Sequence, residues 1–289
     1  MFPASFDYVA PRSLEEALAE LDEKGEEAKV VAGGQSLIPL MKLRFAEPGM
    51  LVDLNRIGGL AGIEEADDAL ALGALVRHND VAFSEVVNRS HPLIASAAPQ
   101  IADPLVRNMG TLCGSLCHAD PAGDWGSVML ALGAQVTATS SSGRRTIPID
   151  DFLVDTFTTS LQPNEMVTEV RVPGPRGSSG GAYLKLERKV GDFATVGVAV
   201  QLELSNGAIG RAGIGLTAVG PSNIRAAEAE SALAGAAPDG EAFEEAAQLA
   251  ARAAEPGDDV RGSADYKRAV VAAFVKRGLV TALELARRA

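Results

Sequence analysis

The stretch VVAGGQSL, residues 30–37, combines a short apolar strand, two adjacent glycines and the first residues of a helix. Because glycine has no β-carbon, the backbone N–H groups of Gly33 and Gly34 can approach an anionic ligand closely. Ser36 is placed to cap the helix that follows. The stretch therefore suits a pyrophosphate, and a glycine turn without a ligand is the alternative. It is not a GxGxxG dinucleotide fingerprint, since no third glycine follows at the right spacing.

A second segment of small residues and hydrogen-bond donors, GTLCGS, occupies residues 110–115. It lies in a stretch that we predict to be irregular and that extends to Asp124. An acidic side chain at that position could accept hydrogen bonds from ligand hydroxyls. The alternative is an irregular connection held by hydrogen bonds of Asn108 and Thr111. Neither segment decides the function alone.

Together, the two segments resemble the loops of the medium subunits of the carbon monoxide dehydrogenase and xanthine dehydrogenase family, which are molybdenum hydroxylases. In that family the first FAD loop reads AGG-H/Q/N-S and the second reads T-x-G-G-N/D/S. The resemblance covers nearly the whole chain, because further matching stretches occur in order: DPLVRN (103–108), HADPAGD (118–124), GDFA (191–194) and SADYKR (263–268).

The resemblance implies an α+β fold with two parts. A two-lobed FAD-binding domain of the vanillyl-alcohol oxidase type would span residues 1–175, and a C-terminal domain of an antiparallel sheet plus helices would span residues 176–289. The residue pattern supports a boundary there, since residues 173–181 (PGPRGSSGG) form the clearest break in composition. Beyond this break, alternating apolar residues predict an antiparallel sheet with one buried face, followed by helices.

Local patterns predict the individual elements. Ser13 and Glu16 form a capping box before an amphipathic helix that Gly25 ends. Strands are expected at residues 30–32, 51–54, 69–74, 136–139, 144–147 and 166–172. Further helices are expected at residues 79–87, 92–101, 226–233, 241–253 and 264–288.

Carried over position by position, the resemblance implies a set of FAD-binding residues. Asp124 would bind hydroxyls, Leu161 and Lys185 would lie near the isoalloxazine ring or its polar edge, and Ile101 and Phe193 are further candidates for packing against the ring. No catalytic residue is expected on this chain. The residues implied to contact the diphosphate and ribityl region are Val31, Ala32, Gly33, Gly34, Gln35, Ser36, Leu37, Thr111, Cys113, Gly114 and Ser115.

Cys113 departs from the family pattern, because it occupies the position where the family usually has the first glycine of the second loop. If the backbone there had to adopt a positive φ or touch the diphosphate, a cysteine would cost about 1 kcal/mol or more. We expect instead that the small thiol points away from the ligand.

Charge and cysteine content exclude other classes. The net charge is −12, with 26 Lys plus Arg against 38 Asp plus Glu, so nucleic acid is not an expected partner. The only cysteines, Cys113 and Cys117, form neither a disulfide framework nor an iron–sulfur set. With His118 and Asp120 they could ligate zinc, but no second ligand pair exists, so no metal site is expected. His78 and His91 are expected at the surface or at helix starts, and Trp125 beneath the second loop.

The resemblance also implies partners and a location. FAD on this chain would pass electrons from a [2Fe–2S] cluster on a small subunit to an external acceptor, after a molybdenum cofactor on a large subunit has oxidised the substrate. A dimer of heterotrimers is expected. The first residues do not form a signal peptide, and no apolar run approaches the ~20 residues that span a bilayer, so a cytoplasmic location is expected.

Two other functions compete with this interpretation. A self-contained FAD-dependent oxidoreductase of the vanillyl-alcohol oxidase type would oxidise its own substrate, but such proteins usually add a large substrate domain, and the region after residue 175 contains no evident acid–base pair or nucleophile. The second alternative, a scaffold that has lost FAD, is suggested only by Cys113. Flavin absorbance of the purified chain separates this scaffold from the other two.

Overall fold

The N-terminal region of the computed structural model, which describes residues 2–66 and 68–288, begins with a small parallel sheet. Its strand order is β1 (Asp7–Val9), β3 (Met50–Asp53), β2 (Ala28–Val31). Helix α1 (Leu14–Lys24) packs on this sheet through its apolar face. Ser13 caps α1 by accepting from the backbone N–H of Glu16, and Gly25 ends it, as predicted. The second half of the predicted capping box is wrong, because Glu16 Oε2 accepts from Arg12 N–H at 2.8 Å. The short helix α2 (Leu37–Leu43) leaves β2 through the Gly33-Gly34 turn.

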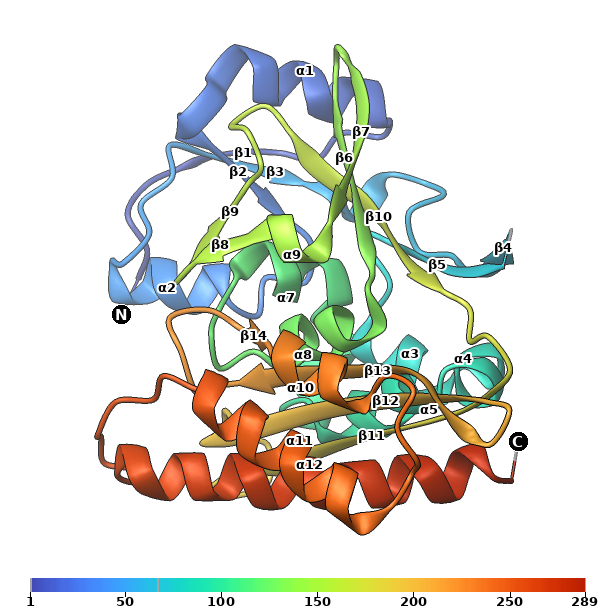
Figure 1. Cartoon of the computed structure of the whole chain (residues 1–289). Helices are drawn as coiled ribbons and strands as arrows, with labels where there is room; N and C mark the ends of the chain where they lie inside the picture. The colour runs from blue at the N-terminus through green and yellow to red at the C-terminus, as the bar shows by residue number, and fades with distance from the viewer. Residues whose placement is uncertain (1, 67, 289) are drawn as a thin grey trace.

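A second, antiparallel sheet lies beside the first (Figure 1). Its strand order is β4 (Ile63–Ala66), β5 (Ala69–Gly73), β10 (Met166–Pro173), β6 (Gln135–Ser140), β7 (Gly143–Pro148). Strands β6 and β7, predicted at residues 136–139 and 144–147, form a hairpin. The small elements α9 (Ile149–Phe152), β8 (Leu153–Asp155) and β9 (Thr158–Thr159) connect β7 to β10.

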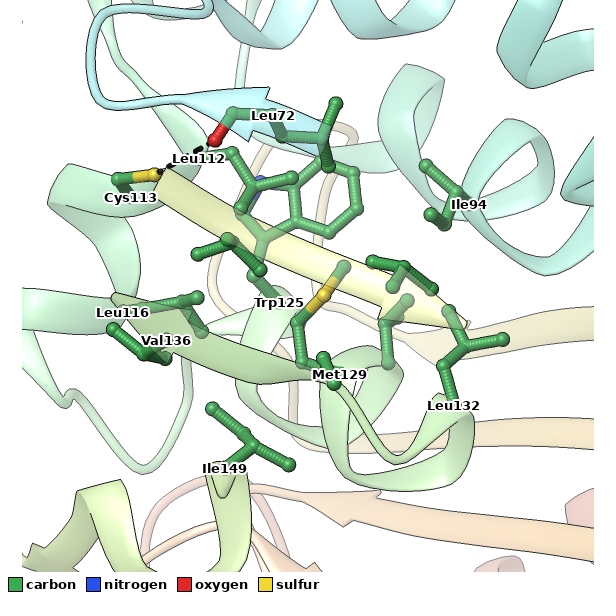
Figure 2. Packing of buried hydrophobic residues seen from close by; sticks show 14 of the residues in the cluster. Leu72, Ile94, Leu112, Cys113, Leu116, Trp125, Met129, Leu132, Val136 and Ile149 are labelled. Carbon is green, nitrogen blue, oxygen red and sulfur yellow. Dashed lines mark hydrogen bonds between the residues drawn. The ribbon is translucent and has the colours of Figure 1, made fainter. Parts of the chain in front are cut away.

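Between β5 and β6 the chain forms a group of short helices that surrounds the main core. These helices are α3 (His78–Phe83), α4 (Glu85–Ser90), α5 (Pro92–Ala97), α6 (Pro104–Met109), α7 (Leu112–His118) and α8 (Asp124–Leu132). Trp125 and Met129 of α8 lie fully buried among apolar side chains of α5, α7 and the second sheet (Figure 2). Burial of this kind contributes roughly 25 cal/mol per Å² of apolar surface.

The C-terminal region contains a four-stranded antiparallel sheet in the order β11 (Ser178–Leu186), β12 (Val196–Ser205), β13 (Ala208–Thr217), β14 (Ile224–Arg225). Helices α10 (Ala227–Leu233), α11 (Gly240–Ala253) and α12 (Ala264–Ala286) follow it. Helix α12 packs along β11 and β12, and α11 packs on α12 (Figure 1). The predicted order of strands then helices is therefore confirmed.

This sheet differs from the prediction because both of its faces are buried. Helices α5 and α8 of the N-terminal region cover the face opposite α12. A β-carbon at Gly213 would overlap the carbonyl oxygen of Ala131, so the backbone of α8 lies directly on β13. Tyr183 and Ala199 of the sheet accordingly belong to the same core as Trp125. The strand pattern could not reveal this second cover, because the covering helices come from a distant part of the chain.

Three predicted elements need correction. The helix predicted at residues 79–87 is two helices, α3 and α4, because Ser84 is extended and its hydroxyl caps α4 by accepting from Val87 N–H. The helix predicted at residues 92–101 ends at Ala97 and continues as a 3₁₀ turn. The stretch predicted to be irregular, residues 110–124, contains α7 and the first residue of α8. Across the described ranges, no helix is both long enough and apolar enough to cross a membrane.

Candidate functional site

The fold places the two glycine segments against each other. A β-carbon at Gly33 would overlap the carbonyl oxygen of Met109 and lie 2.6 Å from the Cα atom of Gly110. Only glycine therefore fits at position 33. Gly34 has a φ of 69°, a left-handed conformation that glycine adopts at little cost. The first segment thus turns sharply while in backbone contact with the start of the second.

The second segment is fixed by its own capping and by strand-like pairing. The Thr111 hydroxyl accepts from Gly114 N–H at 3.0 Å and so caps α7. Leu112 N–H donates to the carbonyl oxygen of Val76 at 3.2 Å, and His78 N–H donates to that of Gly110 at 3.0 Å. These backbone hydrogen bonds with Val76 and His78, which follow β5, therefore fix the position of the second segment.

Ser36 behaves differently from Thr111. It stands at the N-cap position of α2, but within the described part of the chain its side chain makes no capping hydrogen bond. The predicted position of Ser36 at the start of α2 is therefore confirmed, but the predicted capping hydrogen bond is wrong. Ser36, like Ser115 in α7, is half-buried.

The Cys113 thiol points into the core, as expected. Its side chain is 2% exposed, and Sγ lies 3.8 Å from the carbonyl oxygen of Leu72 and 3.6 Å from that of Gly73 (Figure 2). Cys113 is in the first turn of α7 and does not have a positive φ. Burial raises the pKa of Cys113 well above its ordinary value and that of Cys117 to about 12. Both cysteines therefore stay protonated near neutral pH.

Asp124 and Lys185, which the resemblance implied for different parts of the cofactor, form a buried ion pair. Lys185 Nζ lies 2.9 Å from Asp124 Oδ2, and Tyr183 donates its phenolic hydroxyl to Asp124 Oδ1 at 2.6 Å. Lys185 also donates to the carbonyl oxygen of Gln100 at 3.1 Å, and Glu187 Oε2 lies 3.6 Å from its Nζ. Burial raises the pKa of Asp124, and the charge of Lys185 opposes that rise. The pair joins α8 of the N-terminal region to β11 of the C-terminal sheet.

The remaining predicted ring contacts lie on different elements. Leu161 follows β9 and packs half-buried against the main core. Ile101 is buried, whereas Phe193 is 52% exposed. A β-carbon at Gly191 would lie 3.2 Å from the carbonyl carbon of Ala102, so the loop that carries Phe193 lies beside the residues after Ile101. Their contact with a flavin ring stays a prediction.

His78 and His91 both lie at helix starts, as one of the two expectations had it, since His78 begins α3 and His91 is the N-cap residue of α5. The other expectation, a surface position, is wrong for both. Each is 4% exposed. His78 does begin α3, as expected, and its Nδ1 accepts from Trp125 Nε1 at 3.0 Å, beneath the second segment. Burial lowers the pKa of His78 to about 4, so the ring is neutral near pH 7. His118, 3.8 Å from Asp120, also has a lowered pKa because of burial.

Two residues that link the glycine segments were missed by the sequence analysis. The Arg77 guanidinium donates to the carbonyl oxygen of Met109 and to Asn55 Oδ1. Asn55 Nδ2 donates in turn to the carbonyl oxygen of Ala32 at 2.8 Å. Arg77 comes shortly after β5, and Asn55 comes shortly after β3. A polar residue soon after a predicted strand was therefore the sequence signal that could have identified both.

This arrangement fits a flavin dinucleotide. Gly33 lets the backbones of the two segments lie in contact, and the hydroxyl and amide side chains of Gln35, Ser36 and Ser115 can donate to a ligand diphosphate. Within residues 2–66 and 68–288, no group of three or more His, Cys, Asp or Glu side chains could hold a metal ion.

Comparison with known proteins identifies the family. Residues 4–175 match the FAD binding domain in molybdopterin dehydrogenase. The chain belongs to this family. Residues 181–282 match the C-terminal domain of carbon monoxide dehydrogenase flavoproteins. The α+β fold and the FAD-binding character expected from the sequence are therefore confirmed.

Relatives within the family match over nearly their whole length. The carbon monoxide dehydrogenase medium chain of Hydrogenophaga pseudoflava is 44% identical over 96% of this chain and 97% of its own. Subunit alpha of the 6-hydroxypseudooxynicotine dehydrogenase complex of Paenarthrobacter nicotinovorans is 42% identical over 99% and 97%. A solved structure of carbon monoxide dehydrogenase from Hydrogenophaga pseudoflava superposes with a TM-score of 0.95 at 45% identity, covering 98% of this chain and 99% of the matched chain.

Proposed function

We propose that this chain is the FAD-binding medium subunit of a molybdenum hydroxylase complex, an oxidoreductase, and that it passes electrons from a [2Fe–2S] partner subunit to an external acceptor. One observation carries the proposal. In a member of the molybdopterin dehydrogenase FAD family, Gly33 packs on Met109 and Gly110, which brings two distant glycine segments together at one place. Relatives over the full length are medium chains or subunits of such complexes.

The chain's contribution is to bind and orient the cofactor. When bound, FAD supplies reversible one- and two-electron chemistry. Asp124 would hold ligand hydroxyls, and Leu161 and Lys185 would lie at the isoalloxazine ring. No acid or base on this chain is needed for electron entry one at a time. The residues proposed for the diphosphate and ribityl region are Val31, Ala32, Gly33, Gly34, Gln35, Ser36, Leu37, Thr111, Cys113, Gly114 and Ser115, with Cys113 contributing backbone only.

The proposal includes the division of the chain into an FAD-binding domain, residues 1–175, and a C-terminal domain, residues 176–289. The partners are a large subunit with the molybdenum cofactor and a small [2Fe–2S] subunit, assembled as a dimer of heterotrimers in the cytoplasm. The substrate is selected by the large subunit. In support, relatives at 44% and 42% identity carry names with unrelated substrates, carbon monoxide and 6-hydroxypseudooxynicotine.

The test is to purify the chain with and without the products of its neighbouring genes and to quantify FAD, iron and molybdenum in each preparation. We expect FAD on this chain in both, and iron and molybdenum only when the partner subunits co-purify. Substrate oxidation by the isolated flavin-loaded chain would instead support a self-contained oxidase. Absence of flavin from the complete complex would support a scaffold that has lost FAD.

A further inference from the structure

We propose that Arg77 is a positioning residue that sets the distance between the two glycine segments, and that Asn55 extends its reach to the first of them. The inference rests on the proposed function, because it concerns how the FAD-binding segments are held. The Arg77 side chain donates to the carbonyl oxygen of Met109, next to the second segment, and reaches the first segment only through Asn55. It would therefore act on the cofactor through the positions of the two segments.

The Arg77 side chain occupies a central place in the site. It comes four residues after the end of β5, its backbone pairs with Thr111 in an isolated bridge, and its own N–H donates to Asp80 Oδ2 at 3.0 Å. From this fixed base the planar guanidinium donates in two directions, to the Met109 carbonyl oxygen and to Asn55 Oδ1. Arg77 therefore links Met109, which precedes Gly110, to the side chain of Asn55, which follows β3.

Asn55 completes the connection to the first segment. Its Nδ2 donates to the carbonyl oxygen of Ala32 at 2.8 Å, while its backbone N–H donates to Asp53 Oδ1 at 2.9 Å. Asp53 is held in turn by the Tyr8 hydroxyl, which donates to Oδ2 at 2.6 Å. The carboxamide thus accepts from Arg77 and donates to Ala32. The linkage runs from β1 through β3 to both glycine segments.

Geometry, rather than charge alone, makes arginine suitable here. A guanidinium presents donors in a rigid fork and can reach two acceptors at a fixed angle, whereas a lysine ammonium is a point charge on a flexible stem. Arg77 is half-buried, and hydrogen bonds from a charged donor are stronger than neutral ones. Loss of the fork would let the two carbonyls separate, and the segments would no longer present their N–H groups to one diphosphate.

The experiment compares Arg77→Met, Arg77→Lys, Asn55→Ala and the double variant Arg77→Met/Asn55→Ala with the wild-type full chain after removal and re-addition of FAD. Arg89→Met is the matched control, since Arg89 pairs with Glu65 at 2.9 Å on the exposed side of α4 and its loss changes the charge equally. FAD dissociation constants come from flavin fluorescence titration. Phosphorus-31 chemical shifts of bound FAD report the diphosphate environment, and urea unfolding of the apo chain reports stability.

We expect Arg77→Met to raise the FAD dissociation constant about tenfold or more, Arg77→Lys to restore it only in part, and Arg89→Met to leave it unchanged. Both Arg77 variants should shift the diphosphate resonances. The effects of Arg77→Met and Asn55→Ala on affinity should be non-additive, because both break one linkage.

Wild-type affinity in Arg77→Met, or full rescue by Arg77→Lys, would overturn the positioning role, and full rescue would assign the effect to charge. Additive losses from Arg77→Met and Asn55→Ala would also overturn it. If the apo chain of Arg77→Met is unfolded, the FAD dissociation constants of Arg77→Lys and Asn55→Ala test the proposal. Wild-type affinity in both of these variants would overturn it. A wild-type chain that binds no FAD would reject the proposed function itself, which is a distinguishable result.

Discussion

The two glycine segments differ in whether their backbone requires glycine. In the first, Gly33 and Gly34 are required by the backbone: one touches Met109 and Gly110, and the other has a positive φ. In the second, the position of the family's first glycine is filled by Cys113, whose thiol packs into the core.

The difference shows that a glycine in a motif can reflect two separate requirements. Where the missing β-carbon would point at another backbone, no substitution fits. Where it would point into an apolar core, a small side chain fits and adds packing. The same contrast extends to the caps, since Thr111 makes its capping bond and Ser36 does not.

The largest effect is expected for Gly33→Ala. The new β-carbon would collide with Met109 and Gly110 and push the segments apart, so the FAD dissociation constant should rise about a hundredfold or more. Fluorescence titration of the apo chain measures it. Gly58→Ala is the control, because a β-carbon there would meet no described atom within 4 Å. Unchanged affinity in Gly33→Ala would remove the contrast between the segments.

The second segment rests on a buried neutral histidine, which predicts a pH dependence of stability. The pKa of His78 is lowered to about 4 in the folded state, so between about pH 6.5 and 4 the unfolded chain binds more protons and unfolding becomes easier as pH falls. The contribution of His78 should decline by up to about 3 kcal/mol over that range.

Urea unfolding at several pH values, with His78→Asn for comparison, tests this contribution. Asparagine can still accept from Trp125 but does not titrate, so the difference between the two curves isolates His78. Because the pKa values of His91 and His118 are also lowered, some slope of the same sign should remain in the variant. Parallel curves would show that the segment does not depend on a neutral ring.

Cys113→Gly restores the family's usual residue and sharpens the comparison. We expect the FAD dissociation constant to stay within about twofold, and the free energy of unfolding to fall by about 2 kcal/mol, because a buried thiol is lost and glycine disfavours a helix. Cys113→Ala should lose only about half as much. Markedly tighter FAD binding by Cys113→Gly would mean that the cysteine obstructs the ligand.

The smallest effects concern the caps of α2 and α7. Thr111→Ala removes a hydrogen bond to Gly114 N–H and should cost about 1 kcal/mol of unfolding free energy. Ser36→Ala should change it by less than about 0.5 kcal/mol. Equal losses in chemical denaturation would show that both hydroxyls cap their helices.

Most strands and the C-terminal helices could be predicted because their apolar residues repeat with the period of one element. Helix α7 was missed because Gly114 and Thr111 resemble loop residues, although Leu112, Cys113 and Leu116 are buried along one face. Of the candidate site, the motif residues were found from local pattern and resemblance. Arg77 and Asn55 were not found, because their partners are carbonyl oxygens on distant segments and carbonyls have no sequence signature.

The sequence by itself determined the family, the α+β class and the glycine segments, since these depend on local order and residue type. Only the tertiary structure decided that Gly33 lies on Met109, that Asp124 pairs with Lys185, and that α8 covers the second face of the C-terminal sheet. These features join residues far apart in the chain. Their partners are chosen by how the packed elements meet, and a one-dimensional pattern does not contain that information.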